Sequence, residues 1–359
     1  MLTRPLAPSI KAQARELGFS LVGITDVRGS AHAEFYRSWL ERGLHGSMDY
    51  LARQDAVERR TRPDAAWPEL RSAIVVAMPY DAAEPATSDA IVARYARGRD
   101  YHRVMKSKIM TLLRWLEVQA ERELPAARAY VDTGPVLERE LAQRAGLGWF
   151  GRNTMLINQG IGSYFFLGAL LVELELEADA PFTADRCGTC TRCISACPTG
   201  ALLGRDATGA PVMDATRCIS YLTIEQRGPI PRELRPLIGN RVYGCDICQE
   251  VCPWNGRAAS DAPAAGAPSL VDLAAMTYEE WDAYTRGSAM RRAGHSGLRR
   301  NALVALGNLR RAEDVPVLCD TLGDPDPLVR SHAAWALGRI GGAAARAALE
   351  ARYASSSAA

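Results

Sequence analysis

The sequence predicts an α/β protein in three parts: a large N-terminal α/β domain, a small cysteine-rich domain and an all-α C-terminal tail. Three observations support this prediction. Helical and strand patterns alternate over residues 1–180, eight of the nine cysteines lie between Cys187 and Cys252, and the tail contains an internal repeat. With 359 residues, 48% of them hydrophobic, the chain is long enough for two or three domains with buried cores.

The N-terminal domain, residues 1–180, begins with a helix and a strand. Residues 9–17 have the apolar spacing of a helix that ends at Gly18, and a short apolar strand follows at 19–25. The amphipathic stretch from 101 to about 123 predicts a long helix. The other expected elements are a buried strand over 72–78, a strand that ends near Val131, a helix over 135–145 and a strand over 164–176. Helices that cover a sheet make a layered α/β domain.

The cysteines of the second domain, residues 181–256, form two runs that each end in Cys-Pro. The runs are Cys187-x2-Cys190-x2-Cys193-x3-Cys197-Pro198 and Cys245-x2-Cys248-x3-Cys252-Pro253. In bacterial two-cluster ferredoxins, the first three cysteines of such a run bind one [4Fe–4S] cluster and the fourth binds the other. The sequence therefore predicts a ferredoxin-like domain with two [4Fe–4S] clusters, and hence a redox function.

One cluster ligand must come from outside these runs. Val242 stands where the second run should have its first cysteine, and Cys218 is the remaining candidate. We therefore assign Cys187, Cys190, Cys193 and Cys252 to one cluster and Cys197, Cys218, Cys245 and Cys248 to the other. Zinc is the alternative, but paired zinc sites usually read as separated Cys-x2-Cys pairs. The ninth cysteine, Cys319, is expected to be a buried structural thiol.

The tail, residues 286–359, repeats itself. Residues 298–309 align with 329–340 at an offset of 31, and an Asp-Pro-Asp-Pro turn precedes the second copy. This pattern is similar to short HEAT-type helical repeats. Two copies are too few to bury a core alone, so we expect the tail to dock on the main body. The composition of 257–269 is that of a linker, and we take 257–285 as a linker and docking segment.

Five motifs together resemble those of epoxyqueuosine reductases, and the resemblance extends over nearly the whole chain. Such enzymes are cobalamin-dependent iron–sulfur proteins. They reduce the epoxide of epoxyqueuosine at the wobble position of certain tRNA anticodons, the last step of queuosine synthesis. The motifs are Val131-Asp-Thr-Gly-Pro-Val-Leu-Glu-Arg-Glu-Leu141, Arg144-Ala-Gly-Leu-Gly-Trp-Phe-Gly-Arg-Asn153, Cys187-Gly-Thr-Cys-Thr-Arg-Cys-Ile-Ser-Ala-Cys-Pro-Thr-Gly-Ala201, Cys218-Ile-Ser-Tyr-Leu-Thr-Ile-Glu225 and Gly239-Asn-Arg-Val-Tyr-Gly-Cys-Asp246.

The resemblance implies that the N-terminal domain binds cobalamin and that Asp132 donates a proton to the opened epoxide. An ordinary Asp has a pKa of about 4, so desolvation would have to raise the pKa of Asp132. The alternative is that Asp132 only forms a turn or caps a helix. The implied cobalamin contacts are Arg60, Asp132, Arg139, Asn153, Leu156, Asn158, Leu167, Ser220 and Asp246, with Ala93 acting through its backbone.

One further expectation about cobalamin comes from the residues themselves. A protein imidazole that binds the cobalt usually lies in an Asp-x-His-x-x-Gly motif, and the nearest match, Asp100-Tyr-His102-Arg-Val-Met105, fails at Met105. We therefore expect base-off cobalamin without a protein ligand to the cobalt.

The resemblance implies tRNA as the partner. Residues 286–311 contain seven arginines and no acidic residue, which favours phosphate contacts, although a solvated helix face is the alternative. The loop 226–231 is a second candidate for RNA contact. We further expect an unidentified electron donor, a monomer, and a cytoplasmic protein, since the start of the chain shows neither an export signal nor a membrane segment.

Two other functions fit the cysteine pattern. A reductive dehalogenase also pairs cobalamin with two clusters, but such enzymes typically carry a twin-Arg signal and have no HEAT-like tail. An electron-transfer ferredoxin fused to an interaction module would need no large N-terminal domain.

Overall fold

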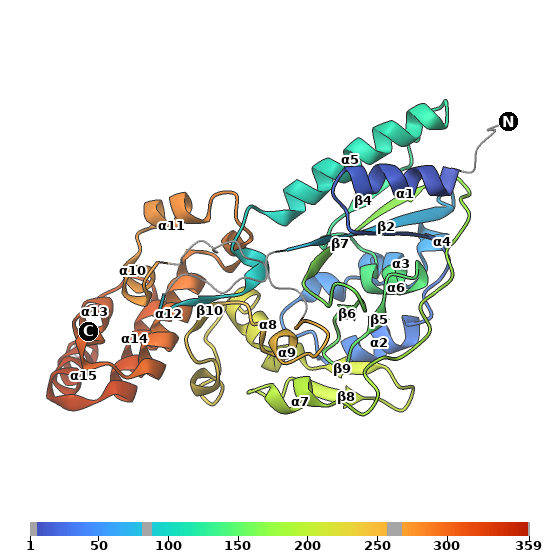
Figure 1. Cartoon of the computed structure of the whole chain (residues 1–359). Helices are drawn as coiled ribbons and strands as arrows, with labels where there is room; N and C mark the ends of the chain where they lie inside the picture. Colours follow the sequence, from blue (N-terminus) through green and yellow to red (C-terminus); the bar gives the residue numbers. More distant parts are fainter. Residues whose placement is uncertain (1–5, 81–87, 257–267, 358–359) are drawn as a thin grey trace.

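The computed structural model describes residues 6–80, 88–256 and 268–357 (Figure 1). Within these residues, the N-terminal domain contains a four-stranded sheet of order β1-β2-β7-β4, and each strand is antiparallel to its neighbours. The strands are β1 (Leu21–Asp26), β2 (Ser72–Pro79), β7 (Phe165–Val172) and β4 (Arg128–Tyr130).

Helices cover both faces of this sheet, and strand β2 shows why. Ile74 and Val76 pack under α1 (Leu6–Glu16) and α5 (Tyr101–Gln119), whereas Ala73, Val75 and Ala77 pack against α6 (Glu138–Arg144). Successive strand residues point to opposite faces, so a strand buried on both faces reads as one apolar run. The remaining helices of this domain are α2 (Ala33–Glu41), α3 (Gln54–Thr61) and α4 (Pro63–Ala66), with short 3-10 turns η1 (Asp49–Leu51) and η2 (Arg94–Ala96).

The cysteine-rich domain is tied to the first domain by a parallel pair of strands, β3 (Ile91–Val92) and β10 (Arg241–Tyr243). Its helices are short, and two of them contain cysteines. They are α7 (Arg192–Ala196), α8 (Ile219–Ile224) and α9 (Ile247–Glu250), with 3-10 turns η3 (Ala215–Arg217) and η4 (Arg235–Leu237). Its hairpin is β8 (Leu202–Arg205) with β9 (Pro211–Met213), and a second short hairpin, β5 (Trp149–Phe150) with β6 (Leu156–Ile157), belongs to the N-terminal domain.

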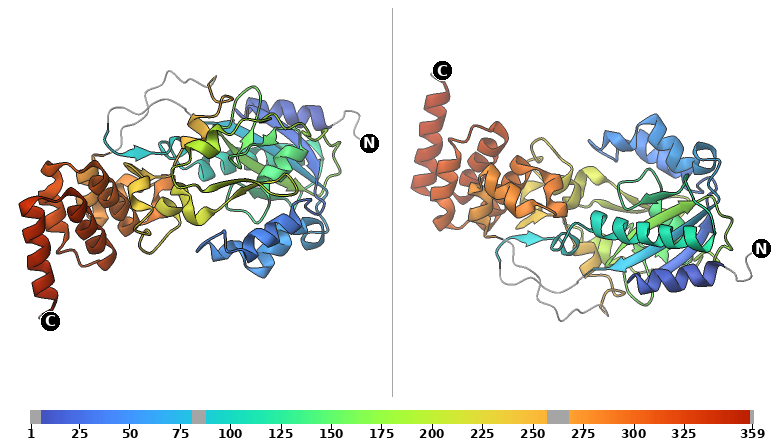
Figure 2. Two further views of the ribbon diagram at one scale, coloured as in Figure 1. Left: turned by 90° about the horizontal axis from the view of Figure 1, so that it is seen from below. Right: turned by 90° about the horizontal axis from the view of Figure 1, so that it is seen from above.

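The tail is helical and extends away from the sheet, so the two termini lie at opposite ends of the molecule (Figure 2). Ser269 and Thr277 form capping boxes at the starts of its first two helices. The helices are α10 (Leu270–Ala275), α11 (Tyr278–Thr285), α12 (His295–Leu309), α13 (Val315–Thr321), α14 (Pro327–Ile340) and α15 (Gly342–Ser357), with η5 (Ala289–Ala293) and η6 (Ala312–Asp314).

Helix α12 docks the tail on the cysteine-rich domain, as the small number of repeats predicts. Asn301 is fully buried and donates to the carbonyl oxygens of Thr223 and Val242, both at 2.8 Å. Val242 itself is 0% exposed and belongs to the core that the tail shares with β3 and β10. The position of the missing cysteine therefore faces this apolar interface.

Several predicted elements have different bounds in the structure. The predicted strand over 164–176 ends at Val172, and the predicted helix over 135–145 starts at Glu138, after the turn that contains Pro135. Helices α2 to α4 were not predicted. Residues 257–267 of the predicted linker lie outside the described residues, whereas 268–285 contain the two capped helices.

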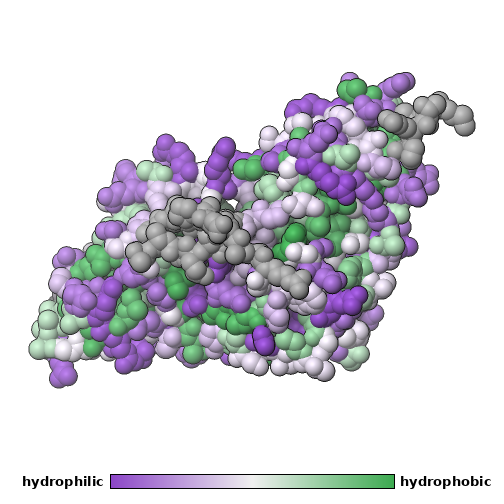
Figure 3. Space-filling model, viewed as in Figure 1, coloured by the Kyte–Doolittle hydropathy of each residue, from purple (hydrophilic) through white to green (hydrophobic). Residues whose placement is uncertain are grey.

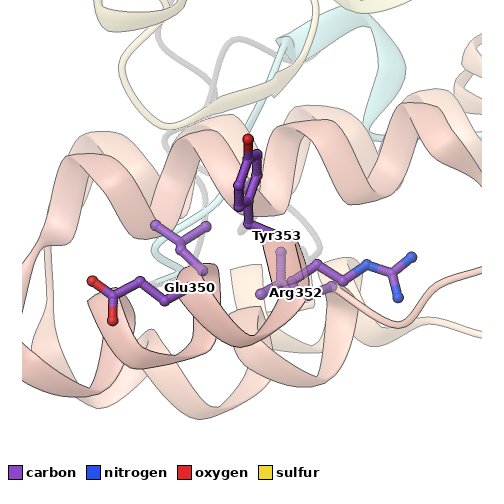
Figure 4. Close-up of a pocket in the computed structure, with 6 residues that line it drawn as sticks. Glu350, Arg352 and Tyr353 are labelled. Carbon is purple, nitrogen blue, oxygen red and sulfur yellow. The ribbon is translucent and has the colours of Figure 1, made fainter. Parts of the chain in front are cut away.

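Hydrophilic and hydrophobic residues are interspersed over the face of the molecule seen in Figure 3. No helix among the described residues is long and apolar enough to cross a membrane. A surface groove of about 570 Å³ lies on the tail, lined by Leu322, Ala334, Leu349, Glu350, Arg352 and Tyr353. In Figure 4, Glu350 and Arg352 point away from each other, and no cluster of facing polar groups is drawn there. This groove lies at the opposite end of the molecule from the sheet (Figure 1), so it is not the site considered below.

Candidate active site and cysteine groups

The loop after strand β4 holds Asp132 in an uncommon conformation. Asp132 has φ 59°, in the left-handed region, and its backbone N–H donates to Oε1 of Glu138 at 2.7 Å. Gly134 follows because a Cβ there would lie 2.3 Å from the ring of Tyr130. A carboxyl group held by a strained, anchored backbone is typical of a functional residue.

The start of α5 supplies two side chains to the carboxylate of Asp132. The hydroxyl of Tyr101 donates to Oδ2 at 3.0 Å, and Nε2 of His102 lies 3.3 Å from the same oxygen. The other ring nitrogen of His102, Nδ1, lies 2.7 Å from Oδ1 of Asp100, the residue that caps α5. The two carboxylates therefore engage both nitrogens of His102.

The electrostatics of this loop differ from the expectation. Burial favours the neutral acid, but the hydrogen bonds from His102 and Tyr101, with the charges of His102 and Arg139, outweigh it, so the pKa of Asp132 is lowered. Desolvation alone would raise this pKa, as an acid at neutral pH requires, but in the structure the neighbouring donors have the larger effect. The Asp132 side chain is 64% exposed, so its carboxylate remains accessible. Burial and the charge of Asp132 raise the pKa of Glu138 to about 8.

Two of the expected cobalamin contacts flank the Asp132 loop. Arg60 is 9% exposed, and one of its guanidinium nitrogens donates to the carbonyl of Gly134 at 3.4 Å. Arg139 is exposed and donates to the carbonyl of Thr154 at 3.1 Å. The structure therefore brings Arg60, Asp132 and Arg139 together.

A second set of expected contacts lies beside the second cysteine run. Asn153 is 2% exposed, and its Nδ2 donates to the carbonyl of Cys248 at 3.3 Å. Asp246 is 6% exposed and accepts from the backbone N–H of Arg94 at 2.7 Å, next to Ala93. Ser220 is half-buried on α8.

The remaining three expected contacts pack in the core or close a loop. Leu156 is 3% exposed and packs in the core under α6, and Leu167 packs against the same core. The side chain of Asn158 closes its own loop, because Nδ2 donates to the carbonyl of Leu147 and Oδ1 accepts from the N–H of Gly160.

The first group of cysteines is assembled from both runs. Burial raises the pKa of Cys193, and the neighbouring thiolates of Cys187, Cys252 and Cys190 raise it further. Cys252 likewise has Cys187 and Cys190 as charged neighbours. The fourth cysteine of the second run therefore lies with the first three cysteines of the first run, as the crossed pattern predicts.

The second group includes Cys218. Burial raises the pKa of Cys218, and Cys197 contributes to the increase. Burial also raises the pKa of Cys248, with contributions from Cys245, Cys218 and, from the other group, Cys193. No three His, Cys, Asp or Glu side chains converge closely enough to hold a single metal ion in the parts of the chain that the structure describes.

The arginine segment 286–311 is not the free basic surface that its sequence suggests. Its acidic partners come from elsewhere in the chain. Arg286 and Arg291 pair with Asp282, Arg292 with Glu225, Arg299 with Asp324, and Arg311 with Asp89 and Asp314.

Arg300 is 1% exposed and donates to the carbonyls of Leu222, Gln226 and Gly228. Phosphate contacts were expected from the seven arginines of 286–311, but Arg299 is paired with Asp324 and Arg300 is buried, so neither is a free surface residue. The contacts of Arg300 also fix the loop 226–231 to α12.

Sequence reasoning missed three residues of the Asp132 site. Tyr101 and Glu138 carried no signal of their own, and His102 was considered only as a ligand to cobalt. Two features pointed to them: the Asp100-x-His102 spacing at a helix start, and the glutamate six residues after Asp132 within one motif.

Three family models match separate parts of the chain. The model described as "Epoxyqueuosine reductase QueG, DUF1730" matches residues 60–133, "4Fe-4S double cluster binding domain" matches 186–255, and "HEAT repeats" matches 285–359. The three matches fall on the N-terminal domain, the cysteine-rich domain and the tail.

Characterised proteins are similar over most of their length. An epoxyqueuosine reductase of Pseudomonas aeruginosa is 44% identical over 354 residues, which cover 94% of this chain and 95% of that protein. The Escherichia coli epoxyqueuosine reductase is 41% identical, with 92% and 89% covered. A crystal structure of selenomethionine-labelled epoxyqueuosine reductase superposes with a TM-score of 0.85 at 32% identity, covering 97% of this chain and 93% of that one. An epoxyqueuosine reductase with a tRNA-Tyr epoxyqueuosine-modified stem loop gives 0.83 at 30% identity, with the same coverage.

Proposed function

Because this chain belongs to the epoxyqueuosine reductase family, we propose that it reduces the epoxide of epoxyqueuosine in tRNA to queuosine. The observation that supports this most directly is the closeness of an acid to a redox centre. Arg139 lies on the helix that follows Asp132 and donates a hydrogen bond to the carbonyl of Thr154. Asn153, the residue before Thr154, donates a hydrogen bond to the carbonyl of Cys248. A proton donor and an electron source next to each other suit the reduction of an epoxide.

The double-cluster domain binds two [4Fe–4S] clusters. We propose that Cys187, Cys190, Cys193 and Cys252 hold one cluster and that Cys197, Cys218, Cys245 and Cys248 hold the other. The contributions of Cys193 to the pKa of Cys248 support a short path between the two groups. Such a pair passes electrons singly toward the substrate site.

The residues around Asp132 fit cobalamin. Its periphery carries amide groups and a phosphate, and Arg60, Arg139, Asn153 and Ser220 are donors that suit them. His102 has both ring nitrogens engaged by carboxylates, which supports binding without a protein imidazole on the cobalt. When bound, cobalamin supplies a low-potential cobalt centre for the reduction.

Asp132 is proposed as the acid that protonates the epoxide oxygen. General acid catalysis of this kind contributes about 10²- to 10⁴-fold to a rate. Glu138 fixes the loop through the backbone N–H of Asp132, and Tyr101 orients the carboxylate. The contacts Ala93, Leu156, Asn158, Leu167 and Asp246 are proposed to shape the cofactor site rather than to take part in the chemistry.

The substrate, a tRNA, places the reaction in the cytoplasm, where cluster cysteines also stay reduced. We propose that the chain acts as a monomer and receives electrons from a separate, unidentified donor. tRNA affinity then comes from surfaces other than the paired arginines of the tail.

Anaerobic incubation of the cluster- and cobalamin-loaded protein with epoxyqueuosine tRNA and a strong reductant tests the proposal. Mass spectrometry of the nucleosides should show queuosine formed in proportion to enzyme turnover. Omission of cobalamin is the control and should abolish the product. Full loading without any queuosine would overturn the proposed function.

A further inference from the structure

The proposed reaction needs two protons in each turnover. Converting an epoxide into an alkene breaks two C–O bonds, forms the second C–C bond, consumes two electrons and two protons, and releases the oxygen as water. A carboxylic acid carries one proton. Asp132 alone therefore cannot supply both protons without being recharged.

The charge of Asp132 at neutral pH adds a second requirement for proton supply. Its hydrogen bonds with His102 and Tyr101 lower its pKa below the ordinary value, so Asp132 is a carboxylate at neutral pH. The proton that it passes to the substrate must then be held by a neighbour. This neighbour must contact Oδ1 or Oδ2 of Asp132 and must also reach solvent.

We propose that His102, oriented by Asp100, stores the protons that Asp132 delivers to the substrate oxygen. This inference rests on the proposed function. Nε2 of His102 lies 3.3 Å from Oδ2 of Asp132, and Nδ1 lies 2.7 Å from Oδ1 of Asp100. An imidazolium donates from both nitrogens, so the two carboxylates match its charged form. The His102 side chain is 29% exposed, which leaves it open to recharging by water.

Opposing effects act on His102. Burial lowers its pKa, and the N-terminal end of α5 also disfavours a cation. The hydrogen bonds and charges of Asp132 and Asp100 outweigh burial, and the pKa of His102 is raised. The ionisable groups near this pair also include Tyr101, Arg103, Glu138, Arg139, Tyr50, Tyr95 and Tyr243.

Two of these neighbours are rival proton sources, and their contacts argue against both. Tyr101 donates to Asp132, but burial and the charge of Asp132 raise its pKa far above neutrality, so it keeps its proton. Glu138 has a raised pKa, but it accepts a hydrogen bond from the backbone N–H of Asp132 rather than donating to the Asp132 carboxylate. Glu138 is therefore a positioning residue.

The proton steps balance as follows. The Nε2–H bond of His102 breaks and an Oδ2–H bond forms on Asp132 when the bound cofactor and substrate exclude water, because a desolvated ion pair favours its neutral form. Asp132 gives this proton to the epoxide oxygen as the first C–O bond breaks. Neutral His102 takes a second proton from water and passes it along the same route, and the oxygen leaves as water. The two electrons come from the clusters.

Replacing His102 tests the store. In the loaded protein, His102→Gln should lower turnover about 10²-fold with iron and cobalamin content unchanged. The remaining activity should rise as pH falls, because Asp132 must then take its proton from water. Imidazole in solution should partly restore His102→Ala. The control, His295→Gln, changes a histidine that contacts the carbonyl of Met276 in the tail and should keep the wild-type rate and pH profile.

A second measurement does not depend on activity. The five histidines of the chain allow His102 to be followed by ¹⁵N NMR with the clusters oxidised, assigned by the signal lost in His102→Gln. Its titration should move to lower pH in Asp132→Asn and in Asp100→Asn. Activity of His102→Gln within about threefold of wild type at every pH, or a titration unaffected by either Asp change, would overturn the proposal. Absence of queuosine from the wild type would instead overturn the proposed function.

Discussion

Replacement of Arg300 by Met should loosen the tail from the cysteine-rich domain. Arg300 is 1% exposed and donates to the carbonyls of Gln226, Gly228 and Leu222 at 2.6, 2.8 and 2.8 Å. Methionine fills a similar volume but leaves these carbonyls without a donor. Each unsatisfied buried acceptor costs about 1–3 kcal/mol.

A second effect acts in the opposite direction. The acceptors of Arg300 are carbonyl and amide oxygens, and burial together with Arg227 and Arg235 lowers the pKa of Arg300 to about 10. Removing a cation in this environment recovers part of its desolvation cost. We therefore expect Arg300→Met to lower the free energy of unfolding by about 3–5 kcal/mol, which is less than the full sum for three lost hydrogen bonds.

The assay is amide hydrogen exchange over α8 and the loop 226–231, together with urea unfolding of the cluster-loaded chain. Exchange is needed because a multidomain protein with bound clusters does not unfold in a single two-state step. Arg310→Met is the matched control, since Arg310 is exposed at the end of α12 and surface changes usually stay within about 0.5 kcal/mol. Unchanged exchange in Arg300→Met would refute the reasoning. Charge reversal at Arg300 is accordingly a test of folding and not of tRNA binding.

Three further predictions concern the site and its surroundings. Cys218→Ala should lose about half of the bound iron and sulfide, because one of the two clusters then lacks a ligand. Cys319→Ala is the control and should keep all of the iron and sulfide. A full iron content in Cys218→Ala would contradict the assignment. Asp132→Asn should retain clusters and cobalamin but lose about 10²-fold in turnover, and a rate near wild type would reduce Asp132 to a turn residue. Nδ1 of His32 lies 3.1 Å from Oε2 of Glu140. This pairing raises the pKa of His32, and it outweighs the opposing effect of burial to lower the pKa of Glu140. The stabilisation that this pair gives the folded state should therefore be greatest between pH 4.5 and 6.5, the ordinary pKa values of Glu and His. It should fall as pH drops through the folded pKa of Glu140, and also as pH rises through the folded pKa of His32. Equal pH profiles of thermal unfolding for wild type and His32→Gln would contradict this.

The proposed cysteine grouping could be derived from the sequence because ligand spacing is a local, chemical constraint. The Cys-Pro endings and the missing cysteine at Val242 led to Cys218, and the structure places Cys218 beside Cys197. The major helices and strands of the N-terminal domain could also be predicted, since their apolar periodicity reflects the buried faces directly. Helices α2 to α4 could not be predicted, because each of them buries a single apolar side chain. These side chains are Tyr36, Ala56 and Pro63.

The electrostatic character of a segment could not be predicted from its own residues. The window 286–311 contains no acid, but Asp89, Glu225 and Asp324 reach it from distant parts of the chain. The same limit applies to Asp132. Its pKa depends on His102 and Tyr101, thirty residues earlier in the sequence, which only the packing of α5 beside β4 brings into contact.

The Asp132 loop and the second cysteine group are linked by a chain of hydrogen bonds. Arg139 follows Asp132 on α6 and bonds Thr154, whose neighbour Asn153 bonds the backbone of Cys248. Thr154 has φ 65°, so this turn, like that of Asp132, adopts its conformation only because surrounding contacts impose it. A cluster that fixes Cys248 therefore also fixes the turn that anchors Arg139. In the mechanism that we propose, with Asp132 as the acid and Cys248 as a cluster ligand, the proton source and the electron source are therefore connected through the backbone of Asn153 and Thr154.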